Sequence, residues 1–113
     1  LPTLPQAALI YRLSGDANPM HVLPAVARAA GFARPILHGR CSFGVAGHAI
    51  LRTLCGYDAT RLLGMTARFT TPVYPGETLR TQLWKTAGGV LFRTRVVERD
   101  VVALDNGFAA LLT

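Results

Sequence analysis

The segment 41–54, C-S-F-G-V-A-G-H-A-I-L-R-T-L, is predicted to form a central buried helix around which the other elements pack. Its length suits a helix of about four turns, and only His48 and Arg52 in it are strongly polar. A helix that is apolar on nearly every side is expected to be buried on nearly every side. Gly44 and Gly47 each weaken a helix by about 1 kcal/mol, so we expect them to let a strand or a ligand approach closely.

Strands are predicted after this helix, over residues 62–71, 78–87, 90–98 and 101–112. The third of them alternates, with one face formed by Val90, Phe92, Thr94 and Val96 and the other by Leu91, Arg93, Arg95 and Val97. Gly88-Gly89 predicts a tight hairpin before it, and Asp105-Asn106-Gly107 predicts a bulge in the last strand. Helices over residues 4–13 and 23–30 are expected earlier in the chain. This is an α+β layout, with an antiparallel sheet wrapped around a long central helix.

The segment Tyr11 to His21, Y-R-L-S-G-D-A-N-P-M-H, carries the most reactive side chains. Asp16, Asn18 and His21 lie close together in a stretch of turn-forming residues. A carboxylate and an imidazole on one rigid loop can move a proton at neutral pH. The segment is therefore the first candidate for a catalytic site.

The composition limits the class of protein. A chain of 113 residues, half of them hydrophobic, is expected to form one small domain. No apolar run approaches the ~20 residues of a membrane span, and the first residues lack a basic signal start, so we expect a soluble, intracellular protein. Cys41 and Cys55 would lie about 21 Å apart along the helix, too far for a disulfide, and no metal site is expected.

The charge of the chain also limits its ligands. The net charge is +6, with eleven arginines and one lysine. This excess can reflect base composition in the source genome or binding of a polyanion. The arginines are scattered without interleaved aromatic residues, so coenzyme A is favoured over nucleic acid.

Three segments together carry a family resemblance: Tyr11 to His21, then L-H-G-R-C-S-F-G from Leu37 to Gly44, then A-R-F-T-T-P-V-Y-P-G-E-T-L from Ala67 to Leu79. They resemble the (R)-specific 2-enoyl-CoA hydratases of the MaoC-like dehydratase group, which have the hot-dog fold. That group includes the hydratase domain of peroxisomal multifunctional enzymes of fatty-acid oxidation. The resemblance implies a single MaoC-like hot-dog domain over residues 1–113, similar to the C-terminal catalytic half of a double hot-dog hydratase and without its first strand.

The resemblance also implies the reaction. It is the addition of water to trans-2-enoyl-CoA to give (3R)-3-hydroxyacyl-CoA, or the reverse dehydration. Asp16 and His21 would be the catalytic pair, with acid and base unassigned, and the backbone N–H of Gly39 would stabilise the thioester oxygen. For Gly39, the alternative is a glycine needed only for a tight turn.

Other residues have smaller implied roles. The resemblance makes Asn18 the residue that orients the water or the pair, and it extends substrate binding to four more residues: Ala17, Pro19, Met20 and Phe69. For Phe69, an ordinary core aromatic is an equally good interpretation. His38 is expected to be structural, bonded to a backbone group.

The remaining expectations concern cofactors, a pairing partner, alternative functions and the cell compartment. No cofactor is expected, because coenzyme A is part of the acyl-CoA substrate. An uncovered sheet edge and apolar face predict a homodimer or pairing with a second hot-dog unit. The alternatives are a hot-dog acyl-CoA thioesterase, a non-catalytic hot-dog subunit of a heteromeric dehydratase, and a dehydratase that acts on carrier-protein substrates. A bacterial form would be cytoplasmic and a eukaryotic form peroxisomal.

Overall fold

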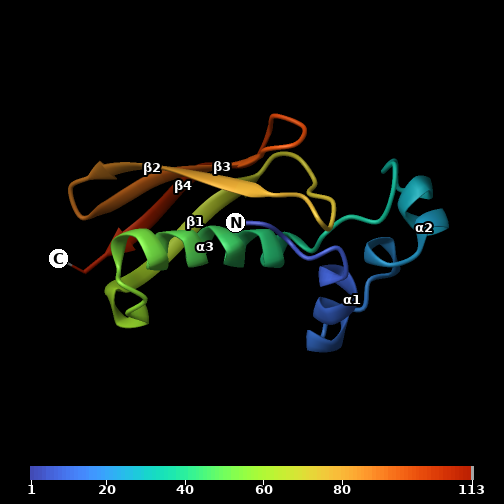
Figure 1. Cartoon of the computed structure of the whole chain (residues 1–113), viewed down its shortest axis with the longest axis horizontal. Coiled ribbons are helices and arrows are strands. Elements are labelled where there is room, and N and C mark those ends of the chain that lie inside the picture. The colour runs from blue at the N-terminus through green and yellow to red at the C-terminus, as the bar shows by residue number, and fades with distance from the viewer. Residues whose placement is uncertain (113) are drawn as a thin grey trace.

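The computed structural model describes residues 1–112. One long helix, α3 (Gly39–Leu54), lies along one face of a four-stranded antiparallel sheet (Figure 1). The sheet has the order β1-β4-β3-β2 and consists of four strands: β1 (Leu62–Phe69), β2 (Leu79–Thr86), β3 (Gly89–Val96) and β4 (Val101–Leu111). The predicted α+β layout and its four strands are confirmed, with strand ends that differ by at most two residues.

Strand β3 shows why the sequence forms a one-sided sheet. Its residues alternate between two faces, as predicted, and the side chains of one face are buried while those of the other are exposed or half-buried. Gly88 has φ +78° and turns the chain between β2 and β3. Asn106 has φ +50°, and the register of β4 shifts beside it against both neighbouring strands. The predicted hairpin and bulge are therefore confirmed.

The core lies between α3 and the sheet. Ala46 and Ile50 of α3 pack against four buried sheet residues, Val90, Phe92, Leu104 and Ala109. A second cluster, near the start of α3, contains Leu37, Val73, Leu79, Val96 and Ala103. Burial of this apolar area is the main source of stability.

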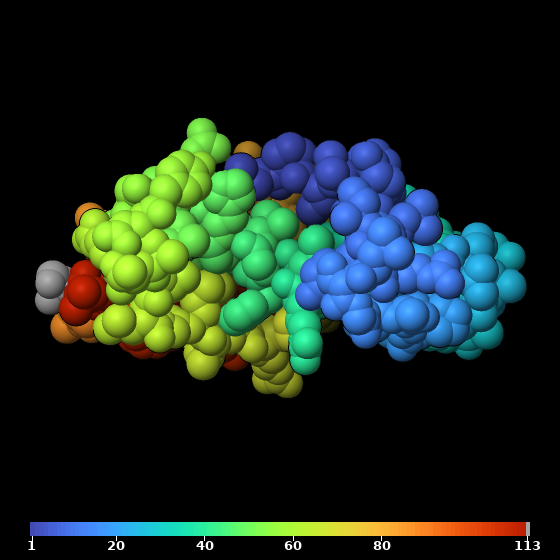
Figure 2. All heavy atoms as spheres, turned by 90° about the horizontal axis from the view of Figure 1, so that it is seen from below, coloured from blue at the N-terminus to red at the C-terminus, as the bar shows by residue number. Residues whose placement is uncertain are grey.

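Helix α3 is not buried on every side, contrary to the prediction from its sequence. Four of its residues are buried, namely Ser42, Ala46, Gly47 and Ile50. Gly44 and His48 are exposed on the opposite face, which no other element of the described chain covers (Figure 2). Gly47 does allow the expected close approach, since a Cβ there would lie 3.2 Å from Sδ of Met65 on β1.

The N-terminal part of the chain packs beyond the start of α3 (Figure 1). It contains two short helices, α1 (Ala7–Tyr11) and α2 (Pro24–Ala29), joined by 3₁₀ turns. The prediction of a helix from residue 4 is wrong by three residues, since α1 begins at Ala7. Before it, the N–H of Thr3 donates to the carbonyl of Glu77, and Pro2 pairs with Thr78. The backbone of this end is thus held by the segment that leads into β2.

Candidate active site

His21 ends a 3₁₀ turn, Pro19–His21, and its side chain is buried. Its Nδ1 lies 2.7 Å from the carbonyl oxygen of Ile36. A carbonyl can only accept a hydrogen bond, so Nδ1 carries the proton and donates it. The neutral ring therefore keeps a lone pair on Nε2, which is what a base needs.

Asp16 lies at the start of the same loop, which its neighbours hold in a defined shape. The N–H of Asn18 donates to Oδ1 of Asp16 (3.3 Å), and Oδ1 of Asn18 accepts the N–H of Met20 (3.1 Å). These are the side-chain-to-backbone bonds of Asx turns. They fix the spacing between the exposed Asp16 and the buried His21.

His38 joins the two predicted catalytic residues. Its ring is fully buried and stacks on the ring of His21, with 3.8 Å between centroids, while Tyr11 packs against it at 4.5 Å. Nε2 of His38 donates to the backbone carbonyl of Asp16 at 3.0 Å, which leaves Nδ1 of this ring without a partner. The expected backbone hydrogen bond is thus present, and His38 holds the Asp16 loop against His21.

The three side chains form a cluster in which one oxygen or nitrogen atom of each lies within 4.8 Å of the others. Such a set could in principle hold a metal ion. The interplanar angle between the His21 and His38 rings is only 24°. The nitrogen lone pairs of a histidine lie in the plane of its ring. In two stacked rings these lone pairs are therefore nearly parallel and do not point at one common ion. In addition, Nε2 of His38 already donates to a carbonyl. The geometry therefore suits proton transfer better than metal binding.

Gly39 is the first residue of α3 and follows directly after His38. No backbone hydrogen bond of the described chain uses the N–H groups of Gly39 or Arg40. Such free N–H groups and the helix dipole favour a negative charge at this point. A Cβ on Gly39 would lie 3.1 Å from Cε1 of Phe69, so the ring packs directly over the glycine. A tight turn alone does not explain this contact.

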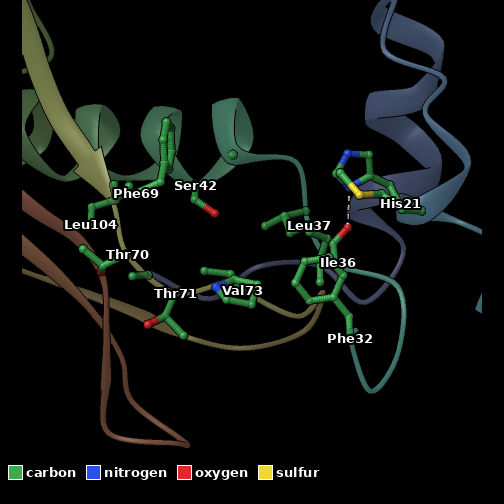
Figure 3. A pocket seen from close by; sticks show the side chains of 14 residues that line it. His21, Phe32, Ile36, Leu37, Ser42, Phe69, Thr70, Thr71, Val73 and Leu104 are labelled. Carbon is green, nitrogen blue, oxygen red and sulfur yellow. Dashed lines mark hydrogen bonds between the residues drawn. The ribbon is translucent and has the colours of Figure 1, made fainter. Parts of the chain in front are cut away.

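A pocket of about 390 Å³ opens beside these groups (Figure 3). Its walls are mainly apolar and come from the start of α3, the end of β1, the segment after β1, and the loop before α3. The labelled lining residues include His21, Phe32, Ile36, Leu37, Ser42, Phe69, Val73 and Leu104. The pocket thus has the character of a site for an apolar ligand with a few polar contacts.

The predicted substrate-binding residues divide into two groups. Met20 and Phe69 line the pocket. Ala17, Asn18 and Pro19 are exposed and belong to the loop, outside the lining of the pocket. Asn18 shapes that loop through its side chain. The binding roles of all five residues stay predictions.

Sequence reasoning missed most of the pocket wall. Thr70, Thr71, Pro72 and Val73 follow β1 and line one side of it. Ser42 lines another side, and Figure 3 shows its hydroxyl directed into the pocket. A helical period places Ser42 one turn after Gly39 on the same face, and that spacing is the one signal that could have found it.

An ion pair supports the chain segment on the far side of the pocket. Arg99 donates to both oxygens of Glu77, at 2.6 and 2.9 Å, and to the carbonyl of Pro72 at 2.7 Å. Burial by itself raises the pKa of Glu77, but hydrogen bonds from Arg99 and from the N–H of Tyr74 outweigh burial and lower that pKa. The carboxylate therefore stabilises the turn that carries the pocket wall.

Comparison with known proteins identifies the family. The sequence model of the protein family described as "MaoC like domain" matches residues 1–106 of this chain. The chain belongs to the MaoC-like domain family. Its four-stranded antiparallel sheet and long helix are the hot-dog fold of that family, as predicted.

Relatives of this MaoC-like domain include 3-hydroxyacyl-thioester dehydratase Y of Mycobacterium tuberculosis, which is 50% identical over 95% of this chain and 39% of its own length. The peroxisomal enoyl-CoA hydratase 2 of Arabidopsis thaliana is 48% identical over 90% of this chain and 33% of its own length. A crystal structure of a MaoC-like dehydratase from Phytophthora capsici has a TM-score of 0.96 and 43% identity over the whole chain and 39% of its own length. The chain thus spans well under half of each of these relatives.

Two further features of the domain are the state of its cysteines and the character of its helices. Cys41 and Cys55 are free thiols, and burial raises the pKa of Cys41. Within the described residues, no helix combines the length and the apolar character that a membrane crossing requires.

Proposed function

We propose that this domain catalyses the addition of water to trans-2-enoyl-CoA, giving (3R)-3-hydroxyacyl-CoA, or the reverse dehydration. One observation carries the proposal: His21 and Gly39, whose N–H is free, line one apolar pocket of about 390 Å³, and Asp16 lies beside His21 just outside that lining. The names of the two relatives describe enoyl-CoA hydration and 3-hydroxyacyl-thioester dehydration, which are one reaction in opposite directions.

Each group has a task in this reaction. Nε2 of His21 and the carboxylate of Asp16 form the pair that takes a proton from water and delivers one to C2 of the substrate. As water adds at C3, negative charge grows on the thioester oxygen. The N–H of Gly39, at the start of α3, stabilises that charge.

We further propose that the reaction uses no cofactor, and that coenzyme A enters only as part of the substrate. Water addition to an activated double bond needs acid, base and an oxyanion donor, and the residues above supply all three. Treatment with a metal chelator should therefore leave the rate unchanged. A loss of activity that Zn²⁺ or Mg²⁺ restores would contradict this part of the proposal.

Pairing with a second hot-dog unit, either a second copy or another part of the same polypeptide, is also proposed. Strand β1 is an edge strand with a free side, and Leu63 on it is 62% exposed. Trp84, Leu91 and Phe108, which are neighbours across β2, β3 and β4, are between 37% and 49% exposed. Exposed edges and apolar patches of this kind are normally covered in stable proteins. The domain itself would correspond to the C-terminal half of a double hot-dog hydratase. The compartment would be the cytoplasm in a bacterium and the peroxisome in a eukaryote.

The test is an absorbance assay on the full-length protein with crotonyl-CoA and trans-2-decenoyl-CoA. Loss of the conjugated enoyl absorbance without release of free coenzyme A, and with a (3R) product on chiral analysis, is the expected result. The ratio of the two rates then reports the acyl length that the pocket accepts. Release of free coenzyme A would instead indicate a thioesterase. No reaction with either substrate would refute the proposed activity on acyl-CoA.

A further inference from the structure

Ser42 is a buried polar residue that the reaction scheme above leaves unused. It is 3% exposed and lines the pocket near the start of α3. Its hydroxyl takes part in none of the side-chain hydrogen bonds among the described residues, whereas the nearby His21, His38 and Thr70 all form one. The hydroxyl is therefore free to bond with water or with a ligand in the pocket.

The hydroxyl keeps contact with the pocket and is not sealed inside the protein. Among the described residues, Nδ1 of His38 is the one side-chain polar atom that is wholly enclosed and lacks a partner. The hydroxyl oxygen of Ser42 also lacks a partner but is not enclosed in this way, so its remaining accessible surface faces the pocket, as Figure 3 shows. A ligand in the pocket can therefore reach it.

The local backbone explains why the hydroxyl is free. A serine within a helix commonly donates to the carbonyl four residues earlier, which here belongs to His38. That carbonyl already accepts two bonds, from the N–H of Cys41 at 3.0 Å and from the N–H of Ser42 itself at 3.2 Å. A carbonyl oxygen has two lone pairs. The usual acceptor is therefore occupied, and the hydroxyl is left for the pocket.

The direction of the side chain points to one end of the pocket. Side chains on a helix lean toward its N-terminus, and residues three apart share a face at about 5–6 Å between Cβ positions. The hydroxyl of Ser42 thus leans toward the turn that begins with Gly39, and Figure 3 shows it directed into the pocket. Gly39 and Ser42 line the same pocket. Both residues thus offer a donor to the same pocket at the start of α3.

The other hydroxyls of the pocket are already satisfied or can reach water. Thr70 donates to the carbonyl of Val102 at 2.7 Å. Thr71 is only half-buried, so solvent can serve it. Among the described lining residues, Ser42 alone is a buried residue whose hydroxyl has no partner in the chain.

We propose that Ser42 is a second donor to the thioester oxygen of the substrate, acting beside the N–H of Gly39. This inference rests on the proposed hydration and adds to it. The hydroxyl donates a hydrogen bond and loses no proton. Its bond strengthens as negative charge grows on the oxygen, so it should lower the barrier more than it tightens ground-state binding.

The test compares three variants of the full-length protein. Ser42→Ala should lower kcat for crotonyl-CoA hydration by about 10²-fold, the usual effect of losing one oxyanion donor, with a small change in KM. Ser42→Thr keeps a hydroxyl and should retain most of the rate. Cys41→Ala is the control: this neighbour is half-buried against the second core cluster and outside the pocket lining, so kcat should not change.

A spectroscopic readout separates this role from a structural one. A bound dimethylaminocinnamoyl-CoA, whose absorbance moves to longer wavelength when its carbonyl accepts hydrogen bonds, should shift less in Ser42→Ala than in the unaltered protein and in Cys41→Ala. An equal shift in all three proteins, or an unchanged kcat in Ser42→Ala, would overturn the inference. The shift needs no turnover. If the unaltered protein hydrates nothing, the proposed reaction fails, and the shift alone decides whether Ser42 contacts the thioester.

Discussion

Substitution of Gly39 by alanine should separate activity from stability. A Cβ at this position would lie 3.1 Å from Cε1 and 3.3 Å from Cζ of Phe69. Ordinary contacts of a Cβ lie at 3.4–4 Å, so the ring has to move by a few tenths of an ångström. Phe69 is 57% exposed and can move toward solvent at little cost. The fold should therefore tolerate the new methyl group.

The effect on the reaction should be much larger. The methyl group would stand beside the N–H that is proposed to hold the thioester oxygen, and it would displace a ring that lines the pocket. The methyl group would obstruct the approach of the thioester oxygen to this N–H, and weakening one oxyanion donor in this way can cost about 10²-fold in rate. For stability, replacing glycine by alanine in a helix gains up to ~1 kcal/mol. We therefore expect kcat to fall by about 10²-fold while the melting temperature stays level or rises.

The assay is crotonyl-CoA hydration, followed by absorbance, together with a thermal melt of the same preparation. Gly44→Ala is the matched control, because Gly44 lies in the same helix and a Cβ there meets nothing within 4 Å. That variant should keep its kcat and gain a similar amount of stability. A Gly39→Ala protein with unchanged kcat would refute the assignment of Gly39 to the site. A strong loss of stability would show instead that the contact with Phe69 is rigid.

Three other predictions concern the acid–base pair, the ion pair of Glu77 with Arg99, and the close contact at Gly107. Asp16→Asn and His21→Gln should each lower kcat by about 10²–10⁴-fold with little change in circular dichroism, and a variant with full activity would remove that residue from the catalytic pair. Glu77→Gln should lower the free energy of unfolding by about 1–2 kcal/mol at neutral pH, through its bonds with the partly exposed Arg99. Because the pKa of Glu77 is lowered from 4.5 in the folded state, its contribution is complete above that value and is lost as the pH falls through the native pKa, so urea melts of the two proteins should converge in acid. Gly107→Ala should cost about 2 kcal/mol, since its Cβ would lie 2.6 Å from a backbone carbonyl of β3, and an unchanged melting temperature would contradict this contact.

The elements with a regular pattern were predictable. Strand β3 alternates along its sequence, and the structure has the two predicted faces, of which the one with Val90, Phe92, Thr94 and Val96 is buried. Gly88 and Asn106 mark a turn and a bulge because their positive φ values suit glycine and asparagine. These features depend on a few neighbouring residues, so the local sequence contains the information.

The burial of α3 was not predictable from its composition. The sequence of α3 is apolar on most sides, yet one face lies against the sheet and the other is uncovered in the described chain. Composition records how much apolar surface a helix has. Which part of it meets the sheet depends on the path of β1 to β4. The residues of α3 that stay exposed are glycine or polar: Gly39, Arg40, Gly44, His48, Arg52 and Thr53.

The candidate site also has a part that the local sequence predicted and a part that it did not. The loop with Asp16 and His21 stands out in the sequence because its polar residues and turn formers are adjacent. The stacking of His38 on His21 was not visible, since it joins two residues far apart in the chain through the meeting of the loop and the start of α3. The free hydroxyl of Ser42 depends on which carbonyl lone pairs are already in use.

Local periodicity and adjacent residues were enough to predict the α+β class, the order of the strands along the chain and the acid–base candidates. The fold then brings the loop, the start of α3 and the segment after β1 together around one pocket. It also leaves Asp16, Ala17, Asn18 and Pro19 outside the pocket lining. Such placements follow from packing between segments far apart in the chain, which no local pattern encodes.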